Sequence, residues 1–310
     1  MKISIIVPVF DQRNAGWMAL ESAVNQDFPR DSFEVIAVTG SRGAAEVAAA
    51  GAGALIARCN HVVYTNLDTE DVANEVRLYQ AGYEQSTGEV LFFIEGHTVL
   101  ERRCCGVIDA YFRMHPESAI AWAPRLNQGE TPLGALISRH NLRHERRATE
   151  KGVFSFGATS VIKRSLLERL GGFDGRFLRF SETALFHSML RAGIEIGRIG
   201  EPLATHYNDM SVSQWRKLVM SAGEAKCSYY NTLLARGQDI RAEVRHRVYL
   251  AANRAWCARL LYPLFRAVGA LFLGLALGAW RIGKVPAYSL YVLGLGCTDL
   301  SGFCRARIRG

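Results

Sequence analysis

The pattern of apolar positions changes its period several times over the first hundred residues. Ile3 to Phe10 is a continuous apolar run, which predicts a buried strand. Asn14 can cap the helix that follows, and this helix carries apolar residues at spacings of three and four, namely Trp17, Leu20 and Val24. The chain therefore begins with a strand followed by a helix.

The alternation of strands and helices continues to about residue 94. Further strands are predicted over about 33–38, 61–65 and 89–94, and helices over about 44–57 and 69–85. Repeated strand-helix-strand units of this length form a parallel sheet that helices cover on both faces, with right-handed crossovers. The predicted fold class is therefore α/β, with a mostly parallel, Rossmann-like sheet and flanking helices.

The remainder of the chain is mainly helical apart from one region. Residues 125–160 are less regular and include a basic run, RHNLRHERRATEK, from Arg139 to Lys151. Helices are predicted over about 163–170, 181–192, 211–235 and 241–259, with strand and loop over 195–206. The basic run is typical of a solvated loop, although a polyprenyl diphosphate or an anionic membrane surface would also suit it.

Ligands of open α/β sheets bind beyond the carboxyl ends of the strands, so the residues that follow each strand are the first candidates. Here they are Asp11, the turn Thr39-Gly40-Ser41, and Glu95-Gly96-His97. Glu95 and His97 can both reach one metal ion if the chain turns at Gly96. A mixed carboxylate and imidazole site suits manganese better than magnesium. The alternative is that Glu95 is a solvated strand end and His97 caps the next helix.

Composition narrows the possible partners. The chain has 310 residues and a formal charge of +8, so its surface favours polyanions such as phosphates, anionic lipid or nucleic acid. Nucleic acid is disfavoured because the basic run lacks interleaved aromatic residues. The seven cysteines include no CxxC pair, which predicts free thiols in a reducing compartment. The short apolar N-terminus has no cleavage pattern after it, which predicts folding in the cytosol.

The composition changes near residue 259. Leu260 to Trp280 is apolar except for Arg266, and Pro286 to Cys297 is a second, shorter apolar stretch. Spanning a membrane takes about 20 apolar residues, and the first stretch reaches that length only if Arg266 extends to the interface. Re-entrant or interfacial helices therefore fit better than two clean spans. A buried soluble helix pair, packed closely at its glycines, is the alternative.

Several short motifs, taken in order, resemble the family-2 glycosyltransferases of GT-A fold. ISIIVPVF resembles the family's opening strand, SAVNQDFP the following helix end, and TGEVLFFIEGH the strand that delivers the metal motif. GGFD at Gly171–Asp174, LRAG at Leu190–Gly193 and the isolated His206 follow in the family's order. The likeness runs from Ile3 to about His206 and points to bacterial enzymes that build exopolysaccharides and cell-surface glycans.

The sequence departs from the family pattern at three acidic sites. Thr39 and Gly40 stand where the family has an acidic pair that holds the nucleotide, and Glu95-Gly96-His97 replaces Asp-x-Asp. Ser181-Glu182 replaces the Glu-Asp pair that supplies the catalytic base, which leaves one carboxylate. A catalytically inactive glycosyltransferase-like scaffold or glycan-binding protein at the membrane is therefore the alternative function.

The resemblance implies a role for each matching residue. The divalent metal, Mn²⁺ or else Mg²⁺, would be bound by Glu95, His97 and His206, and the catalytic base would be Glu182. The donor would contact Asp11, Thr39, Ser41, Arg42 and Glu95, and the acceptor side would include Gly172, Asp174, Trp215 and Arg216. Structural roles are the alternatives: Glu182 can cap its helix, Asp11 and Asp174 can shape turns, and Trp215 and Arg216 can belong to an amphipathic helix.

The resemblance thus implies an inverting glycosyltransferase that moves a sugar from a nucleotide-sugar donor to a lipid-linked or growing glycan, at the cytoplasmic face of the cell membrane. In this interpretation residues 1–208 form the catalytic domain, with a nucleotide-binding half over 1–97 and an acceptor half over 98–208. Residues 209–258 form a helical region, and 259–310 form an apolar membrane-associated segment. A sugar-1-phosphate nucleotidyltransferase is disfavoured, because the glycine-rich loop with a following Arg is absent after the first strand.

Overall fold

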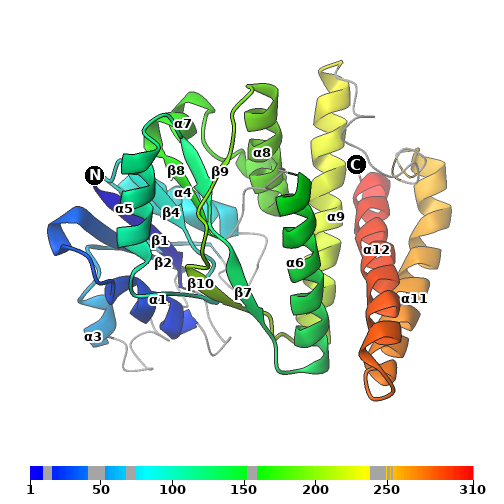
Figure 1. The fold of residues 1–310 in the computed structure, drawn as a ribbon. Coiled ribbons are helices and arrows are strands. Elements are labelled where there is room, and N and C mark those ends of the chain that lie inside the picture. Colours follow the sequence, from blue (N-terminus) through cyan, green and yellow to red (C-terminus); the bar gives the residue numbers. More distant parts are fainter. Residues whose placement is uncertain are drawn as a thin grey trace. The chain divides into compact units, whose positions relative to one another are not determined.

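The computed structural model describes residues 1–9, 16–40, 53–67, 75–151, 159–237, 249, 252 and 254–309. The chain divides into two units, whose elements are drawn in Figure 1. The first unit comprises Met1–Gln128, Asn141–Gly175 and Ser181–Asn208. The second comprises Gly129–His140, Arg176–Phe180 and Asp209–Gly310.

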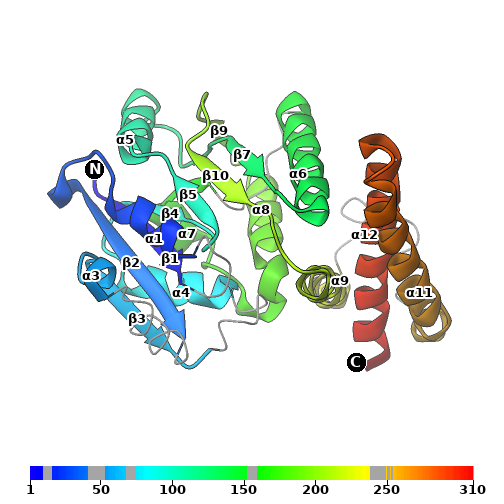
Figure 2. The same cartoon turned by 90° about the horizontal axis from the view of Figure 1, so that it is seen from below.

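A seven-stranded sheet forms the centre of the first unit, with strand order β3-β2-β1-β4-β8-β6-β9. Figure 2 labels its strands β3, β2, β1 and β4. The strands are β1 (Ile3–Pro8), β2 (Phe33–Gly40), β3 (His61–Thr65), β4 (Val90–Phe93), β6 (Ile120–Trp122), β8 (Ser160–Lys163) and β9 (Gly197–Arg198). β1 pairs in parallel with β2 and β4, whereas β8 runs antiparallel to β4 and β6. The predicted α/β class with a mostly parallel sheet is confirmed.

Alternate residues of the central strands face opposite helical layers, as the period of two in a strand requires. On one face Ile3, Ile5 and Val7 are buried in a core shared with α1 (Gly16–Val24), α3 (Gly53–Ile56) and α5 (Cys104–Met114). On the other face Ile6 is buried in a core shared with α4 (Glu75–Gln85), α7 (Arg164–Arg169) and α8 (Ser181–Arg191). Two short 3₁₀ helices, η1 (Arg30–Ser32) and η3 (Gly175–Phe180), lie in the connections.

Helix α4 approaches the sheet closely at Gly82. A β-carbon at this position would lie 2.5 Å from Cγ2 of Ile6 and 2.8 Å from Cγ2 of Val38, so only glycine fits. On the same face the ring centroid of Phe93 lies 5.4 Å from that of Tyr79 and 5.1 Å from that of Phe173. Packing at this density fixes the end of β4, the strand that precedes Glu95.

A three-stranded sheet with the order β5-β10-β7 completes the first unit. Its strands are β5 (Thr98–Leu100), β7 (Arg125–Gln128) and β10 (Ala204–Tyr207). β10 is antiparallel to β5 and parallel to β7, so that His206 lies between Thr98 and Asn127. Residues directly opposite one another in neighbouring strands share a face of the sheet. The side chains of Thr98, His206 and Asn127 therefore lie on one face.

The second unit is helical, with α9 (Val212–Ala235), α11 (Ala255–Ala279) and α12 (Lys284–Arg309). Ser211 caps α9 in a capping box with Gln214. α9 and α12 touch at glycines: a β-carbon on Gly223 or Gly302 would overlap the carbonyl oxygen of Asp299 or Met220. The core of this unit includes Trp215, Leu273, Tyr291 and the first turns of α6 (Pro132–Lys151).

The structure corrects the sequence prediction in two regions. Residues 125–160, expected to be irregular, contain β7 and the 20-residue helix α6. The second apolar stretch is part of α12, which has 26 residues and extends well beyond Cys297. Of the glycines expected to pack closely in the C-terminal helix pair, Gly269 does so against Thr298. A β-carbon on Gly274 or Gly278 would meet no atom of the described residues within 4 Å. Much of the helices predicted over 44–57 and 241–259 lies outside the described residues.

One buried carboxylate ties β1, β2 and the start of β4 together. The side chain of Glu34 is 1% exposed and lies 2.8 Å from Nζ of Lys2. It accepts hydrogen bonds from the Ser4 hydroxyl at 2.6 Å and from the backbone N–H of Thr87 at 2.5 Å. Burial alone would raise the pKa of Glu34, but Lys2, Ser4 and Thr87 outweigh it and lower the pKa from 4.5 to about 2.

The substitution Glu34→Gln is expected to destabilise the protein at neutral pH and to reduce its sensitivity to acid. A carboxyl group whose pKa is lower in the folded state stabilises that state above the unfolded pKa and loses this effect as the pH falls toward the folded pKa. Between pH 4.5 and about 2 the wild type should therefore lose about 3 kcal/mol more unfolding free energy than the variant. Denaturant titrations across this range measure the difference, with Glu84→Gln on the exposed side of α4 as the control. A wild-type advantage that does not change with pH would contradict this role.

Candidate functional site

Three metal-binding side chains converge where β4 ends and β5 begins. Nε2 of His206 lies 2.5 Å from Oε2 of Glu95, and Nε2 of His97 lies 3.2 Å from the same oxygen. The ring centroids of the two histidines are 4.5 Å apart. We call Glu95, His97 and His206 the Glu95 cluster. Glu95 and His97 are two positions apart in the sequence, and His206 lies 111 positions after Glu95.

The backbone around the cluster explains this convergence. The N–H of Thr98 donates to the carbonyl of Glu95 at 2.9 Å, which closes a turn that contains Gly96. The N–H of Tyr207 donates to the carbonyl of His97 at 3.1 Å, and His206 pairs with Thr98 across the small sheet. The expected turn at Gly96 is therefore present, and the register of β10 delivers His206 to it.

The cluster is largely shielded from water and holds a charged carboxylate. The side chains of Glu95, His97 and His206 are 15%, 12% and 7% exposed. Burial alone would raise the pKa of Glu95, but His206, His97 and Arg125 overcome this and hold it well below its usual range. Burial and the charge of Arg125 lower the pKa of His206. An anionic carboxylate and a neutral imidazole are the protonation states in which these groups bind metals.

The residues of the cluster fit a divalent metal. Their ligand atoms all lie within 4.8 Å of one another. They offer a carboxylate oxygen and imidazole nitrogens, and this mixed set suits a transition ion such as Mn²⁺. The hard, oxygen-rich, nearly octahedral set that Mg²⁺ prefers is not what the cluster provides. Among the described residues, these three form the group of histidine, cysteine or acidic side chains that lie close enough together to hold one metal ion.

A layer of hydrogen-bonded polar side chains adjoins the cluster between β7 and α6. Nε of Arg125 donates to Oε1 of Glu145 at 2.9 Å, and Nδ2 of Asn127 donates to the same oxygen at 3.1 Å. Nδ2 of Asn141 donates to Oδ1 of Asn208 at 3.0 Å. We call these five residues the polar layer. The polar layer was not predicted from the sequence. Two signals for it are the alternation of inward and outward residues in β7 and the spacing of four between Asn141 and Glu145.

The residues expected to contact the donor are only partly described. Thr39 is buried at the carboxyl end of β2, and its carbonyl accepts a hydrogen bond from the Thr65 hydroxyl at 3.3 Å. β1 lies between β2 and β4 and is parallel to both, so the carboxyl ends of these strands lie at the same edge of the sheet. Thr39 and Glu95 are both at that edge. Asp11, Ser41 and Arg42 lie outside the described residues.

The expected catalytic base lies in the first turn of α8. Glu182 is partly exposed there, and the hydroxyl of the preceding Ser181 donates to the carbonyl of Asp174. This bond fastens the helix to the GGFD turn, where Gly171 and Gly172 have φ of +80° and +73°. Only glycine adopts these angles without strain. Asp174 and Gly172 therefore shape the turn that sets the start of α8.

The two remaining acceptor candidates lie in the second unit. Trp215 is 2% exposed, and its indole N–H donates to the hydroxyl of Tyr291 at 3.2 Å. These contacts make it a core residue of α9, which is the structural alternative considered for it. Arg216, the next residue of α9, is partly exposed.

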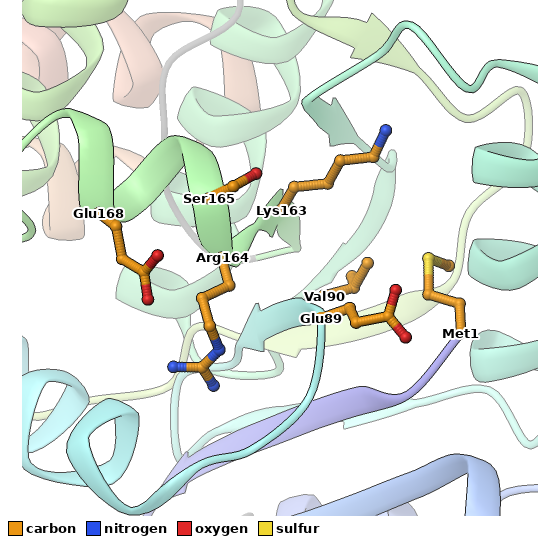
Figure 3. Close-up of a pocket in the computed structure, with 7 residues that line it drawn as sticks. All are labelled: Met1, Glu89, Val90, Lys163, Arg164, Ser165 and Glu168. Atoms are coloured by element: carbon orange, nitrogen blue, oxygen red, sulfur yellow. The ribbon is translucent and has the colours of Figure 1, made fainter.

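A cavity of about 340 Å³ lies at the other end of β4 (Figure 3). It is lined by the start of β4 and by residues around the β8–α7 junction, including Lys163, Arg164 and Glu168. Lys163 donates to the carbonyl of Pro116, and Arg164 donates to the carbonyl of Gly88. Both cations thus serve the fold, and the cavity is separate from the strand ends where the Glu95 cluster lies.

Comparisons with solved structures identify the architecture. No family model and no curated protein matches the sequence. TarS 1–349 from S. aureus, in complex with UDP, is 14% identical with a TM-score of 0.51, over 94% of this chain and 90% of that one. The mannosyltransferase PcManGT from Pyrobaculum calidifontis, in complex with GDP-Man and Mn²⁺, is 16% identical with a TM-score of 0.56, over 99% and 85%. The fold is that of the GT-A glycosyltransferases. At such low identity the likeness establishes the fold, and membership of family 2 stays a prediction.

In this GT-A fold, Glu95→Gln is expected to lower the affinity for Mn²⁺ by more than about 100-fold, because a ligand and its negative charge are lost together. The amide keeps the shape of the side chain, so the hydrogen bond to His206 can persist and the fold should survive. Electron paramagnetic resonance of free Mn²⁺ during titration measures the affinity, and Glu101→Gln, on an exposed residue just after β5, is the control. Equal affinities of the wild type and Glu95→Gln would exclude the Glu95 cluster as the metal site.

Proposed function

We propose that the protein transfers a sugar from a nucleotide-sugar donor, with a divalent metal, to a lipid-linked or growing glycan with inversion at the anomeric carbon. The observation that carries the proposal is the Glu95 cluster at the carboxyl end of β4 in a GT-A fold. The structures of TarS and PcManGT support it, because the first contains UDP and the second contains GDP-Man with Mn²⁺.

The cluster supplies the binding part of this reaction. A divalent ion held there would neutralise the diphosphate and make it a better leaving group. Glu95 contributes the negative charge of the site, and the burial of all three side chains keeps water from weakening their interaction with the ligand. Thr39, at the carboxyl end of β2, would contact the nucleoside in place of the family's acidic pair.

The proton in this reaction would go to Glu182. As the acceptor hydroxyl oxygen bonds to the anomeric carbon, its proton passes to the Glu182 carboxylate. The bond between the anomeric carbon and the phosphate oxygen breaks, and the nucleoside diphosphate leaves with that electron pair. Glu182 lies in the first turn of α8, where the helix dipole favours a negative charge, and this position suits a proton acceptor.

The second part of the proposal is attachment to the cytoplasmic face of a membrane through α11. Trp256–Ala279 is long and apolar enough to cross a membrane, with a mean hydropathy of 1.9. Large apolar side chains at spacings of four and seven stay exposed on one face of it, at Trp256, Leu260, Leu264, Leu271 and Leu275. We call these five residues the α11 stripe. The opposite face, with Gly269 and Leu273, packs on α12.

This geometry favours a helix that lies in the membrane interface over one that spans it. A helix pair with one buried side and one exposed apolar side suits insertion of the stripe into the headgroup region. Arg254, Arg281 and Lys284 flank the stripe and Arg259 lies within its span, and these basic residues would contact anionic lipid.

Calorimetric titration with UDP and GDP, each with Mn²⁺ and with a chelator, tests the donor and the metal together. Binding of one nucleotide that requires metal is the expected result, and it would narrow the donor class. No binding by the folded protein in any condition would overturn the proposal. Metal-dependent binding without transfer to any acceptor would favour the scaffold function that the altered acidic motifs suggest.

The substitution Glu182→Gln is expected to lower the rate of transfer by about 10²- to 10⁴-fold, because the amide cannot accept the proton. Donor binding should be unchanged, since Glu182 is not a metal ligand. Turnover and nucleotide affinity are measured on the same preparation, with Glu168→Gln on the exposed side of α7 as the matched control. A variant that retains full turnover would rule out Glu182 as the base.

The triple substitution Leu260→Ser, Leu264→Ser and Leu271→Ser is expected to weaken binding to anionic vesicles by more than about 100-fold, through the loss of apolar burial. Deletion of the C-terminal helices is a poorer test, because Trp215 packs on α12 and would be uncovered. The matched control changes Met114, Leu190 and Leu234 to serine, since these are equally exposed apolar residues elsewhere. Sedimentation with vesicles that is the same for both triple variants would argue against the stripe.

A further inference from the structure

Arg125 is held beside the Glu95 cluster on the inward face of the small sheet. In the register of β7 and β10, Arg125 lies opposite Ala204 and Asn127 lies opposite His206. Alternate residues of a strand share a face, so Arg125 and Asn127 point to the side on which His206 lies. The charge of Arg125 acts on both Glu95 and His206, which is consistent with this placement.

Glu145 fixes one edge of the Arg125 guanidinium and leaves another edge for a ligand. Nε donates to Glu145 at 2.9 Å, and the Arg125 side chain is only 17% exposed. Nη1 is buried and has no hydrogen-bond partner among the residues that the structure describes. A buried charged donor without an acceptor costs about 1 to 3 kcal/mol or more. Such a group marks a place where a ligand or water completes the bonding.

Two more polar atoms on the same face share this property. Oγ1 of Thr98 and Nδ1 of His206 are buried and lack hydrogen-bond partners within the described part of the chain. Thr98 pairs with His206, and His206 pairs with Asn127, so these atoms belong to adjoining positions of one surface. Three unsatisfied groups at adjoining positions point to a polar ligand.

The charges identify the chemical class of that ligand. A metal ion at the Glu95 cluster would carry two positive charges, and Arg125 adds a third next to it. Two cationic centres side by side repel each other unless an anion lies between them. A group with oxygens for both the ion and the guanidinium meets this requirement, and a diphosphate has both.

We propose that Nη1 of Arg125 binds a phosphate oxygen of the donor's diphosphate, and that the same diphosphate would be neutralised by a metal held at the Glu95 cluster. This inference rests on the proposed function and adds to it a substrate-binding residue outside the sequence motifs. Glu145 is the positioning residue, because its carboxylate holds the guanidinium through Nε. Lysine could not reproduce this arrangement, since it has no planar fork to bind Glu145 and the phosphate at once.

The test compares binding of inorganic pyrophosphate, nucleoside diphosphate and nucleoside, each with Mn²⁺, and of Mn²⁺ alone. Arg125→Gln should weaken binding of both phosphate-containing ligands by about 10- to 100-fold, the loss expected for a hydrogen bond to a charged group. Binding of the nucleoside alone should not change. Affinity for Mn²⁺ without phosphate should stay the same or increase, because a neighbouring positive charge is removed. A purely structural role for Arg125 would instead lower both affinities.

A second variant distinguishes a loss of ligand binding from a folding defect caused by an unpaired buried charge. The double substitution Arg125→Met and Glu145→Leu removes both partners, so that no buried charge is left uncompensated. It should show the same selective loss of pyrophosphate binding. Arg164→Gln, at the opposite end of β4, removes a partly buried arginine that bonds only to the fold, and should leave pyrophosphate binding unchanged.

The outcomes separate this inference from the proposed function. If the wild type binds pyrophosphate and nucleoside diphosphate with Mn²⁺ and both Arg125 variants bind them equally well, the role of Arg125 is overturned while the proposed function stands. If the folded wild type binds neither ligand, the proposed function fails and the role of Arg125 fails with it. Weaker binding of Mn²⁺ alone by both variants would show that Arg125 supports the fold of the site and not the diphosphate.

Discussion

The bond between Glu95 and His206 joins the two sheets of the first unit. Glu95 follows β4 of the large sheet, and His206 belongs to β10 of the small one, with 2.5 Å between their atoms. A carboxylate this deeply buried costs about several kcal/mol unless charges and hydrogen bonds compensate it. The turn at Gly96 and the register of β10 supply that compensation. The site and the junction of the sheets are therefore one structural feature.

The need to compensate the buried carboxylate of Glu95 also explains why this face of the small sheet is polar. Arg125 and Asn127 occupy the inward positions of β7, where a strand under a helix would normally carry apolar residues. A helix that covers a polar strand must offer hydrogen-bond partners to its side chains. In α6 these partners are Asn141 and Glu145, which are four residues apart and so lie about one helical turn from each other. Of the basic residues of the run, Arg143, His144 and Arg146 are exposed. Arg139 instead donates to the carbonyl of Lys284 in α12.

Apolar periodicity predicted β1, β2 and β4 because these strands are buried on both faces and look like continuous apolar runs, as Ile3–Pro8 and Val90–Phe93 do. It also predicted β3, but it missed the short strands β6 and β8 of the same sheet. The same rule failed for α6, whose inward residues Asn141 and Glu145 give no apolar signal. Arg125 was missed for a related reason: only the fold shows that it lies beside His206. His206 itself was found through the family resemblance alone, since nothing local connects it to a partner 111 residues away.

The histidines of the cluster change the charge of the site in a way that bears on its chemistry. A site built from two aspartates would carry two negative charges and would bind the ion strongly before any donor arrives. With both imidazoles in the neutral form that binds metals, the cluster would carry one negative charge, from Glu95, and the positive charge of Arg125 acts on it. Glu145 contacts Nε of Arg125 at 2.9 Å and reduces the effect of this positive charge without removing it. The ion and the diphosphate then need each other to bind: the ion brings the positive charge that the diphosphate requires, and the diphosphate relieves the repulsion between the ion and Arg125. Binding in such a site is expected to be strongly cooperative between metal and donor.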